Sequence, residues 1–112
     1  IKKSSKGYKR FKREGGHSSN VMEKFTKKMK ELQAKGVKII IFGMPIGGSP
    51  RRILDRTFSD QLAQAHFDEE GIKYVSVIES SKQVRPNKND VHYGNRYVEY
   101  FNKVLLPHLR NF

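Results

Sequence analysis

The chain contains no cysteine and no tryptophan, and it is poor in acidic residues. Without cysteine, disulfides and thiolate metal sites are excluded. No apolar run approaches the roughly 20 residues that a membrane-spanning helix needs, and no signal peptide is visible, so no transmembrane segment is predicted. None of these absences identifies a compartment, and the localisation is left unknown.

Basic residues are in large excess, with 23 Lys and Arg against 11 Asp and Glu. Residues 1–30 hold eleven Lys or Arg against two Glu, which is +9 of the total net charge of +12. Such a concentration favours contact with a polyanion, either nucleic acid or an anionic membrane. A solubilising tail would have the same composition, so charge alone does not choose between these roles.

Residues 1–19 show no helical or strand period and contain glycine breaks, which predicts an irregular basic arm before a domain of residues 20–112. In this arm two aromatic residues alternate with cations, a pattern that suits base stacking combined with phosphate contacts. The two aromatics could equally anchor the arm to its own domain. The candidate nucleic-acid-binding residues are Lys2, Lys3, Lys6, Tyr8, Lys9, Arg10, Phe11, Lys12 and Arg13.

Beyond the arm, a helix is predicted after Asn20, whose side chain would form a capping box with Glu23, and Gly36 would end it. Its apolar face would consist of Met22, Phe25, Met29 and Leu32, and its solvated side of Lys24, Lys27, Lys28 and Lys30. The continuous apolar run Ile39–Phe42 predicts a strand covered on both faces.

Helices and strands are predicted to continue alternating in the rest of the chain. We expect a helix ending by Gly71, a strand over residues 72–79, a polar loop over residues 79–92 and a last helix that Pro107 kinks or shortens. The apolar faces of the two helices would be Leu54, Phe58, Leu62 and Ala65, and then Tyr97, Phe101, Val104, Leu105 and Leu109. His66 and His108 are expected at the surface of these helices.

Strands that alternate with amphipathic helices predict an α/β fold with a parallel sheet. Two strands alone do not make a stable sheet, so this sheet is predicted to be incomplete. Further strands would then come from an upstream segment or from another chain.

Residues from about 20 to 109 resemble the second half of SGNH (GDSL-type) esterases and acyltransferases. The resemblance lies in the strand "GVKIIIFGMPI", the later strand "GIKYVSVIES" and the segment "NDVHYGNRYVEYFNKVL" before the last helix. It implies a flavodoxin-like three-layer sandwich, here without the block that carries the family's nucleophile. The usual pattern separates acid and histidine by two residues, whereas here one residue separates Asp90 from His92 and Asn89 occupies the usual acid position.

The resemblance implies that His92 is a general base and Asp90 its orienting partner in a Ser-His-Asp site. An upstream segment would have to supply the serine. In the alternative reading, Asp90 caps the last helix and His92 is a surface residue. Gly47, Gly48 and Ser49 could present backbone N–H groups to an anion, although a glycine pair after a strand is more often a turn. No metal site and no cofactor are predicted.

Two functions therefore follow from the sequence. The first is cleavage or transfer of an ester, such as an O-acetyl group on a carbohydrate or lipid, by an SGNH-like enzyme. The second is a non-catalytic role, because some SGNH-like domains lack the nucleophile and bind RNA. In that case the basic arm would contact RNA or another polyanion. Further cations on the middle helix and in the loop before Asp90 would suit the same role, namely Arg51, Arg52, Arg56, Lys82, Arg85 and Lys88.

Overall fold

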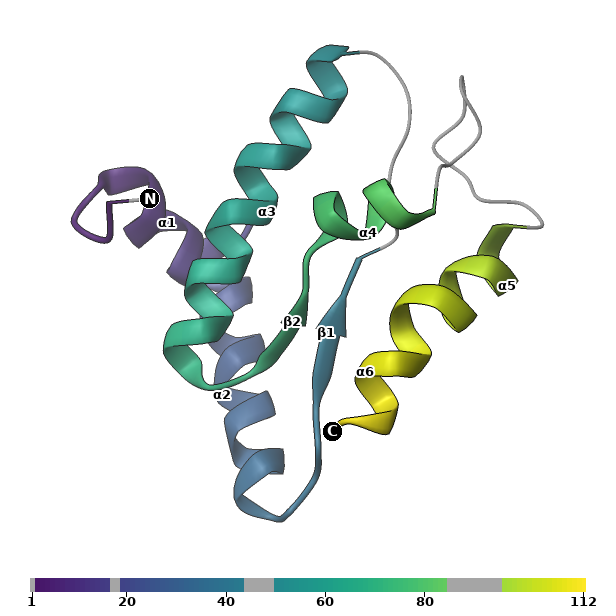
Figure 1. Ribbon diagram of the computed structural model, residues 1–112. Coiled ribbons are helices and arrows are strands. Elements are labelled where there is room, and N and C mark those ends of the chain that lie inside the picture. Colours follow the sequence, from purple (N-terminus) through teal and green to yellow (C-terminus); the bar gives the residue numbers. More distant parts are fainter. Residues whose placement is uncertain (1, 17–18, 44–49, 85–95) are drawn as a thin grey trace. The chain divides into compact units, whose positions relative to one another are not determined.

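The computed structural model describes all residues except 1, 17–18, 44–49 and 85–95, and it leaves out the side chains at positions 50, 52, 96 and 97. The described chain is mostly helical, with a parallel sheet of two strands, β1 and β2 (Figure 1). In chain order the elements are α1 (Lys6–Glu14), α2 (Val21–Ala34), β1 (Ile40–Phe42), α3 (Pro50–Glu70), β2 (Lys73–Val75), α4 (Val77–Gln83), α5 (Arg96–Tyr100), the π-helical turn η1 (Phe101–Leu105) and α6 (Leu106–Arg110).

The chain groups into two compact units. The first unit contains Ile1–Ile41 and Gln61–Tyr74, and the second contains Phe42–Asp60 and Val75–Phe112. The division falls within β1, α3 and β2, so each of these elements contributes residues to both units. Each unit is described separately below.

The core of the first unit forms around the C-terminal half of α3 and the residues that immediately precede β1 and β2. Ile39, Ala63, Phe67 and Ile72 are buried together. Apolar side chains from α1, α2 and both strands pack against them, namely Phe11, Met22, Met29, Leu32, Ile41 and Tyr74. This confirms most of the apolar face predicted for α2, because residues spaced by three and four share one side of a helix.

Helix α1 lies in the segment for which an irregular arm was predicted, so that part of the prediction is wrong. Ser5 caps the helix by accepting a hydrogen bond from the Tyr8 amide at 3.2 Å. Gly15 ends it with a φ of +70°, which a glycine adopts without strain. Charged residues and Gly7 hide the helix in the sequence, but the aromatic pair at a spacing of three gives it an inward face.

Helix α2 begins and ends where the sequence predicts, although its predicted cap is absent. It starts directly after Asn20, but the Asn20 side chain makes no capping hydrogen bond. Gly36 follows the helix with a φ of +88°, as expected of a residue that ends a helix. At the same end, Gln33 Nε2 donates to the carbonyl of Gly71 at 3.2 Å and thereby ties α2 to the turn after α3.

The second unit has a core of its own, consisting of Val75, Val84, Tyr100, Val104 and Leu105, all buried. The Tyr100 hydroxyl donates to the carbonyl of Gly43 at 3.1 Å, which joins the last helical segment to the residue that follows β1. Gly43 also lies close to α4, since a Cβ added there would come within 2.7 Å of Val77 Cγ2.

The predicted strand over residues 72–79 is too long. Strand β2 ends at Val75, and α4 covers Val77–Gln83, part of which was predicted as a polar loop. The helix forms because Ser76 caps it, with Ser76 Oγ accepting from the Glu79 amide at 3.1 Å. The carboxylate of Asp60 adds a second cap by accepting from the Val77 amide at 2.8 Å.

The last helical segment departs from the predicted pattern at two points. Phe101 and Leu109 were expected to be buried but are exposed, whereas Tyr100 is fully buried. The burial of Tyr100 follows from η1, in which the Leu106 amide bonds to the Phe101 carbonyl five residues back, so that Tyr100 and Leu105, five residues apart, are both buried. Pro107 lacks the N–H that an α-helical turn requires, and this favours the wider turn before it.

Helix α3 also buries less of its predicted apolar face than expected. Leu62 is buried, but Leu54 and Phe58 are 69% and 58% exposed. The α/β class agrees with the mostly helical chain and its two parallel strands. The flavodoxin-like, SGNH-type arrangement remains a prediction. None of the described helices has the length and apolar character to cross a bilayer.

Candidate nucleic-acid interface

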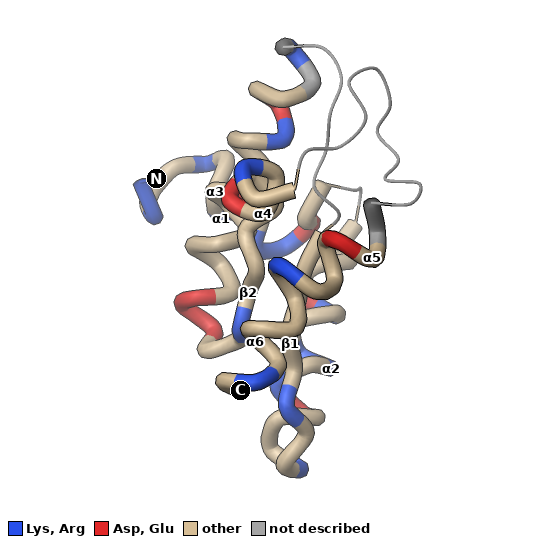
Figure 2. Tube along the Cα trace, turned by 45° about the vertical axis from the view of Figure 1, so that its right-hand side comes forward, with Lys and Arg blue, Asp and Glu red and all other residues tan. Residues whose placement is uncertain are grey.

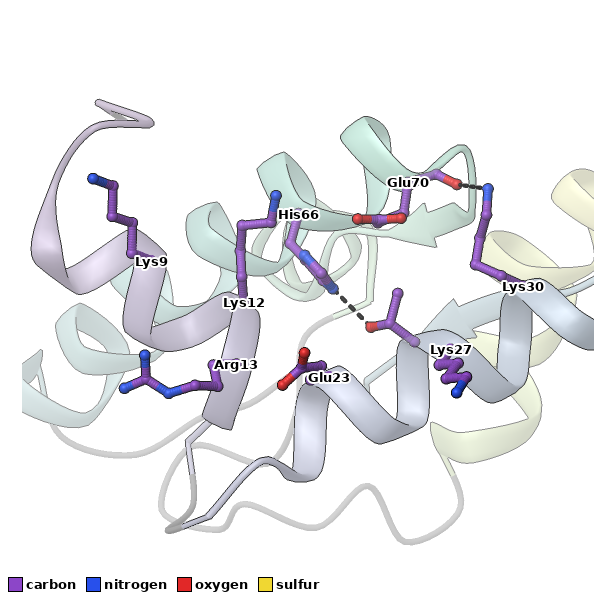
Figure 3. Close-up of a pocket in the computed structure, with 9 residues that line it drawn as sticks. Lys9, Lys12, Arg13, Glu23, Lys27, Lys30, His66 and Glu70 are labelled. Atoms are coloured by element: carbon purple, nitrogen blue, oxygen red, sulfur yellow. Dashed lines mark hydrogen bonds between the residues drawn. The ribbon is translucent and has the colours of Figure 1, made fainter.

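The first unit contains a hollow of about 490 Å³ between α1, α2 and the C-terminal end of α3 (Figure 3). Five cations line it, namely Lys9, Lys12, Arg13, Lys27 and Lys30. Two carboxylates, Glu23 and Glu70, also line it, so the formal charge of its wall is +3 before His66 is counted. The hollow is therefore a place where an anion would be attracted.

Helix α1 brings three of these cations to the hollow because its other side is held by aromatic contacts. Tyr8 is 1% exposed, and its hydroxyl donates to Glu69 Oε2 at 2.6 Å. Lys12 Nζ lies 3.0 Å from the same oxygen. The hydrogen bond from Tyr8 and the ammonium of Lys12 lower the pKa of Glu69, while burial and the Glu69 charge raise the pKa of Tyr8. Glu69 thus fixes α1 in the register that exposes Lys9 and Arg13.

Helix α2 supplies the opposite wall. Lys30 Nζ donates to the backbone carbonyl of Glu70 at 2.6 Å, which places the end of α3 against this wall. Lys27 lies one helical turn earlier and makes no ion pair or hydrogen bond with any described residue. Its ammonium group therefore retains its capacity to bind a ligand.

Thr26 and His66 are the two buried residues among those that line the hollow. Thr26 Oγ1 and His66 Nε2 are 2.9 Å apart, and both residues are buried. His66 Nδ1 has no hydrogen-bond partner in the described part of the chain. Burial is the main cause that lowers the pKa of His66; the charge of Lys12 acts in the same direction, while Glu70 and Glu69 oppose it. The imidazole is therefore neutral at pH 7, and the charge of the hollow comes from its walls.

The structure places the candidate residues of the basic segment on two sides. Lys2 and Lys3 are exposed ahead of α1, and Lys6, Lys9, Arg10 and Arg13 are exposed along it, with Lys12 half-buried. Tyr8 and Phe11 point the other way, since Tyr8 is buried and Phe11 packs on the core, as the anchoring alternative expects. The segment thus exposes its charge and buries its aromatic rings.

Further candidate residues lie outside the described residues. These are Asp90 and His92 of the acid–histidine pair, Gly47, Gly48 and Ser49 of the glycine-rich turn, and the loop cations Arg85 and Lys88. Their roles remain predictions. Within the described ranges, no three His, Asp or Glu side chains come together in a way that could hold a metal ion.

Six residues of the hollow were not singled out from the sequence as a site. Lys27 and Lys30 were placed on the solvated side of their helix and Glu23 in its capping box, while Thr26 and Glu70 were not considered. His66 was expected at the surface, which is wrong, since it is 2% exposed. Its position four residues after Leu62 and next to Phe67 marks it as a member of the buried face of α3.

Comparison with known proteins identifies no family for this chain. The chain matches no protein-family model, no curated protein sequence and no solved structure. The resemblance to SGNH esterases therefore remains a prediction from the sequence.

Proposed function

We propose that this chain binds RNA or a similar nucleic acid through the phosphate backbone, using the basic surface of α1 and α2. The observation that carries the proposal is the density of cations in residues 1–30, which hold eleven Lys or Arg. Figure 2 shows the Lys and Arg positions along the chain trace. Five of the eleven line one hollow (Figure 3). Phosphate contacts by Lys and Arg supply most of the affinity in sequence-independent binding.

The arrangement of α1 supports recognition of the backbone rather than of the bases. Stacking on a base needs an accessible aromatic face. Tyr8 is buried and its hydroxyl is engaged by Glu69, and Phe11 packs on the core. Because these rings are not accessible for stacking, α1 can contact the nucleic acid only through its cations. We therefore expect little preference for the base sequence of the ligand.

The same packing disfavours an anionic membrane as the partner of this surface. A basic helix that binds a membrane buries an apolar face between the lipid headgroups. The apolar side of α1 is turned into its own unit, where Phe11 lies against the core and Tyr8 is buried. Only the charged side of α1 is available for binding.

The test is the salt dependence of binding to a labelled single-stranded RNA, followed by fluorescence anisotropy. Each phosphate contact contributes about −0.7 to the slope of log affinity against log salt for single strands. Replacing Lys9 and Arg13 together by Gln should therefore weaken binding and reduce the magnitude of the slope by about 1.4.

A matched control is the double replacement of Lys103 and Arg110 by Gln, which removes the same charge from exposed positions in the second unit. We expect this variant to bind nearly as the wild type does. An equal loss of affinity in both variants would indicate that RNA is attracted by the net charge alone. An affinity that does not depend on salt would overturn the proposal.

We propose ester hydrolysis as a second function, to be tested on its own. The succession of β1, α3 and β2 with parallel strands supports it, because this order is expected ahead of the acid–histidine segment. The measurement is p-nitrophenyl acetate hydrolysis by the chain extended upstream and by its His92→Ala variant. A fall by orders of magnitude in the variant would support a catalytic His92, and a buffer-level rate in the extended protein would count against the esterase.

A further inference from the structure

His66 is buried where three helices of the first unit meet. It belongs to α3, and its Nε2 lies 2.9 Å from Thr26 Oγ1 on α2. Its ring meets the Phe11 ring of α1 edge-on, with 6.2 Å between the ring centroids. Figure 3 shows the imidazole directed at Thr26. A charge on this ring would therefore act on the contacts of all three helices.

The hydrogen bonding around His66 suits the neutral imidazole. With its proton on Nε2, the ring donates to the Thr26 hydroxyl, and Nδ1 is an acceptor that receives no hydrogen bond from the described residues. The imidazolium would carry a second N–H, on Nδ1, and no described residue accepts a hydrogen bond there. A buried, charged donor without an acceptor is costly. Protonation should therefore favour any state in which His66 reaches water or a carboxylate.

The charged groups that face His66 differ between α1 and its own helix. Lys12 of α1 repels an imidazolium, whereas Glu70 and Glu69 of α3 attract it. Burial is the main cause that lowers the pKa of His66, and Lys12 acts in the same direction. The walls of the hollow add further charges, from α1 Lys9 and Arg13 and from α2 Glu23, Lys27 and Lys30.

Glu69 has two alternative sets of partners. In the structure it accepts from the Tyr8 hydroxyl at 2.6 Å and pairs with Lys12 at 3.0 Å, which attaches α1. It also follows His66 by three residues on α3, a spacing that places two side chains on one face of a helix. If α1 leaves, this carboxylate loses both of its partners and becomes available to an imidazolium.

We propose that protonation of His66 releases α1 from the first unit, with Glu69 changing partner from α1 to the imidazolium. Release takes Lys12 and Phe11 away from the ring, admits water and leaves the ring beside a carboxylate of its own helix. Helix α1 is therefore docked while His66 is neutral and loosened when His66 is charged. The inference goes beyond nucleic-acid binding and does not depend on it, because its measurements use no nucleic acid.

The direction and the pH range of this switch follow from linkage. The pKa of His66 is lowered while α1 is docked, so the released state binds the proton more readily. Docking is at full strength above about pH 6.5, the ordinary value for histidine, and weakens as the pH falls below it. Glu69 stays ionised in this range, because the Tyr8 hydrogen bond and Lys12 lower its pKa.

The first experiment measures amide hydrogen exchange by NMR between pH 7.5 and 5.5, expressed as protection factors to remove the intrinsic pH dependence of exchange. We expect α1 to be less protected than α2. The protection of α1 should fall several-fold, and at most about tenfold for one group at one pH unit below its ordinary pKa. His66→Gln can still donate to Thr26 but does not titrate, so its α1 protection should stay level.

The matched control is His108→Gln, which removes a histidine from the second unit and should behave as the wild type does. A constant α1 protection factor in the wild type would overturn the inference, and so would a fall of the same size in His66→Gln. Equal protection of α1 and α2 at every pH would overturn it as well, because α1 would then open only together with the rest of the unit.

Glu69→Gln tests the exchange of partners independently of any change at His66. The amide oxygen of glutamine can accept from Tyr8, but it has no charge to offer Lys12 or an imidazolium. Helix α1 should therefore be less protected than in the wild type at pH 7.5, and its further decline toward pH 5.5 should be shallower. A decline as steep as that of the wild type would overturn the role assigned to Glu69.

Discussion

The hydroxyl of Tyr8 donates a hydrogen bond of 2.6 Å to the carboxylate of Glu69, a residue 61 positions later in the chain. This contact attaches helix α1 to the end of α3. Because Lys12 binds the same carboxylate at 3.0 Å, one acidic side chain positions the whole basic helix. The cationic hollow therefore depends on a residue that carries the opposite charge.

We expect Tyr8→Ala to detach α1 and to cost about 3–5 kcal/mol of unfolding free energy, since it removes a buried aromatic ring. Tyr8→Phe keeps the ring and loses only the hydrogen bond, so its cost should be nearer to 1 kcal/mol. Urea denaturation measures both values, and amide hydrogen exchange in residues 6–14 reports on the helix. Equal protection of α1 in wild type and Tyr8→Ala would contradict this anchoring role.

The stability of the first unit should fall in weakly acidic solution because of His66. Its folded-state pKa is lowered, mainly by burial, so the unfolded chain takes up a proton more readily than the folded one. The resulting loss of unfolding free energy is absent above about pH 6.5 and grows as the pH falls below it. With allowance for solvent at the open hollow, the loss reaches at most about 1 kcal/mol at pH 5.5. His66→Gln should flatten this dependence between pH 7.5 and 5.5 in urea denaturation. An unchanged pH dependence in the variant would show that other groups cause it.

Asp60→Ala should destabilise the second unit by about 2 kcal/mol, the sum expected for a lost helix cap and for polar groups left without an acceptor. The buried carboxylate accepts from Ser76 Oγ at 2.6 Å and from the Val77 and Ile78 amides at 2.8 and 3.3 Å. Asp55→Ala, an exposed position on the same helix, is the control and should change the midpoint little. A similar loss of stability in both variants would show that Asp60 does not have this capping role.

Two glycines should respond in opposite directions to replacement by alanine. In Gly43→Ala the new methyl group would meet Val77 Cγ2 at 2.7 Å, and the strain should cost about 1–3 kcal/mol. Gly7 lies in α1 with no atom within 4 Å of an added Cβ, so Gly7→Ala should stabilise the protein by about 0.5–1 kcal/mol. Thermal denaturation of the two variants against wild type measures both signs. A stabilised Gly43→Ala would mean that α4 can move away at little cost.

The sequence by itself determined the features that depend on local spacing. Apolar residues at intervals of three and four marked α2, and Gly36 and Gly71 marked the ends of α2 and α3, because glycine adopts a positive φ without strain. The run that includes Ile40–Phe42 marked β1. Each of these signals lies within a few residues of the element that it specifies.

Tertiary structure decided what depends on partners distant in the chain. Helix α1 is held by Glu69. Helix α4 replaces part of a predicted strand because the Asp60 carboxylate, 17 and 18 residues earlier, accepts hydrogen bonds from the first amides of this helix. The hollow likewise joins Thr26 to His66 across 40 residues. Local periodicity carries no information about such pairs, since a side chain far along the chain supplies the hydrogen bond or charge that selects the conformation.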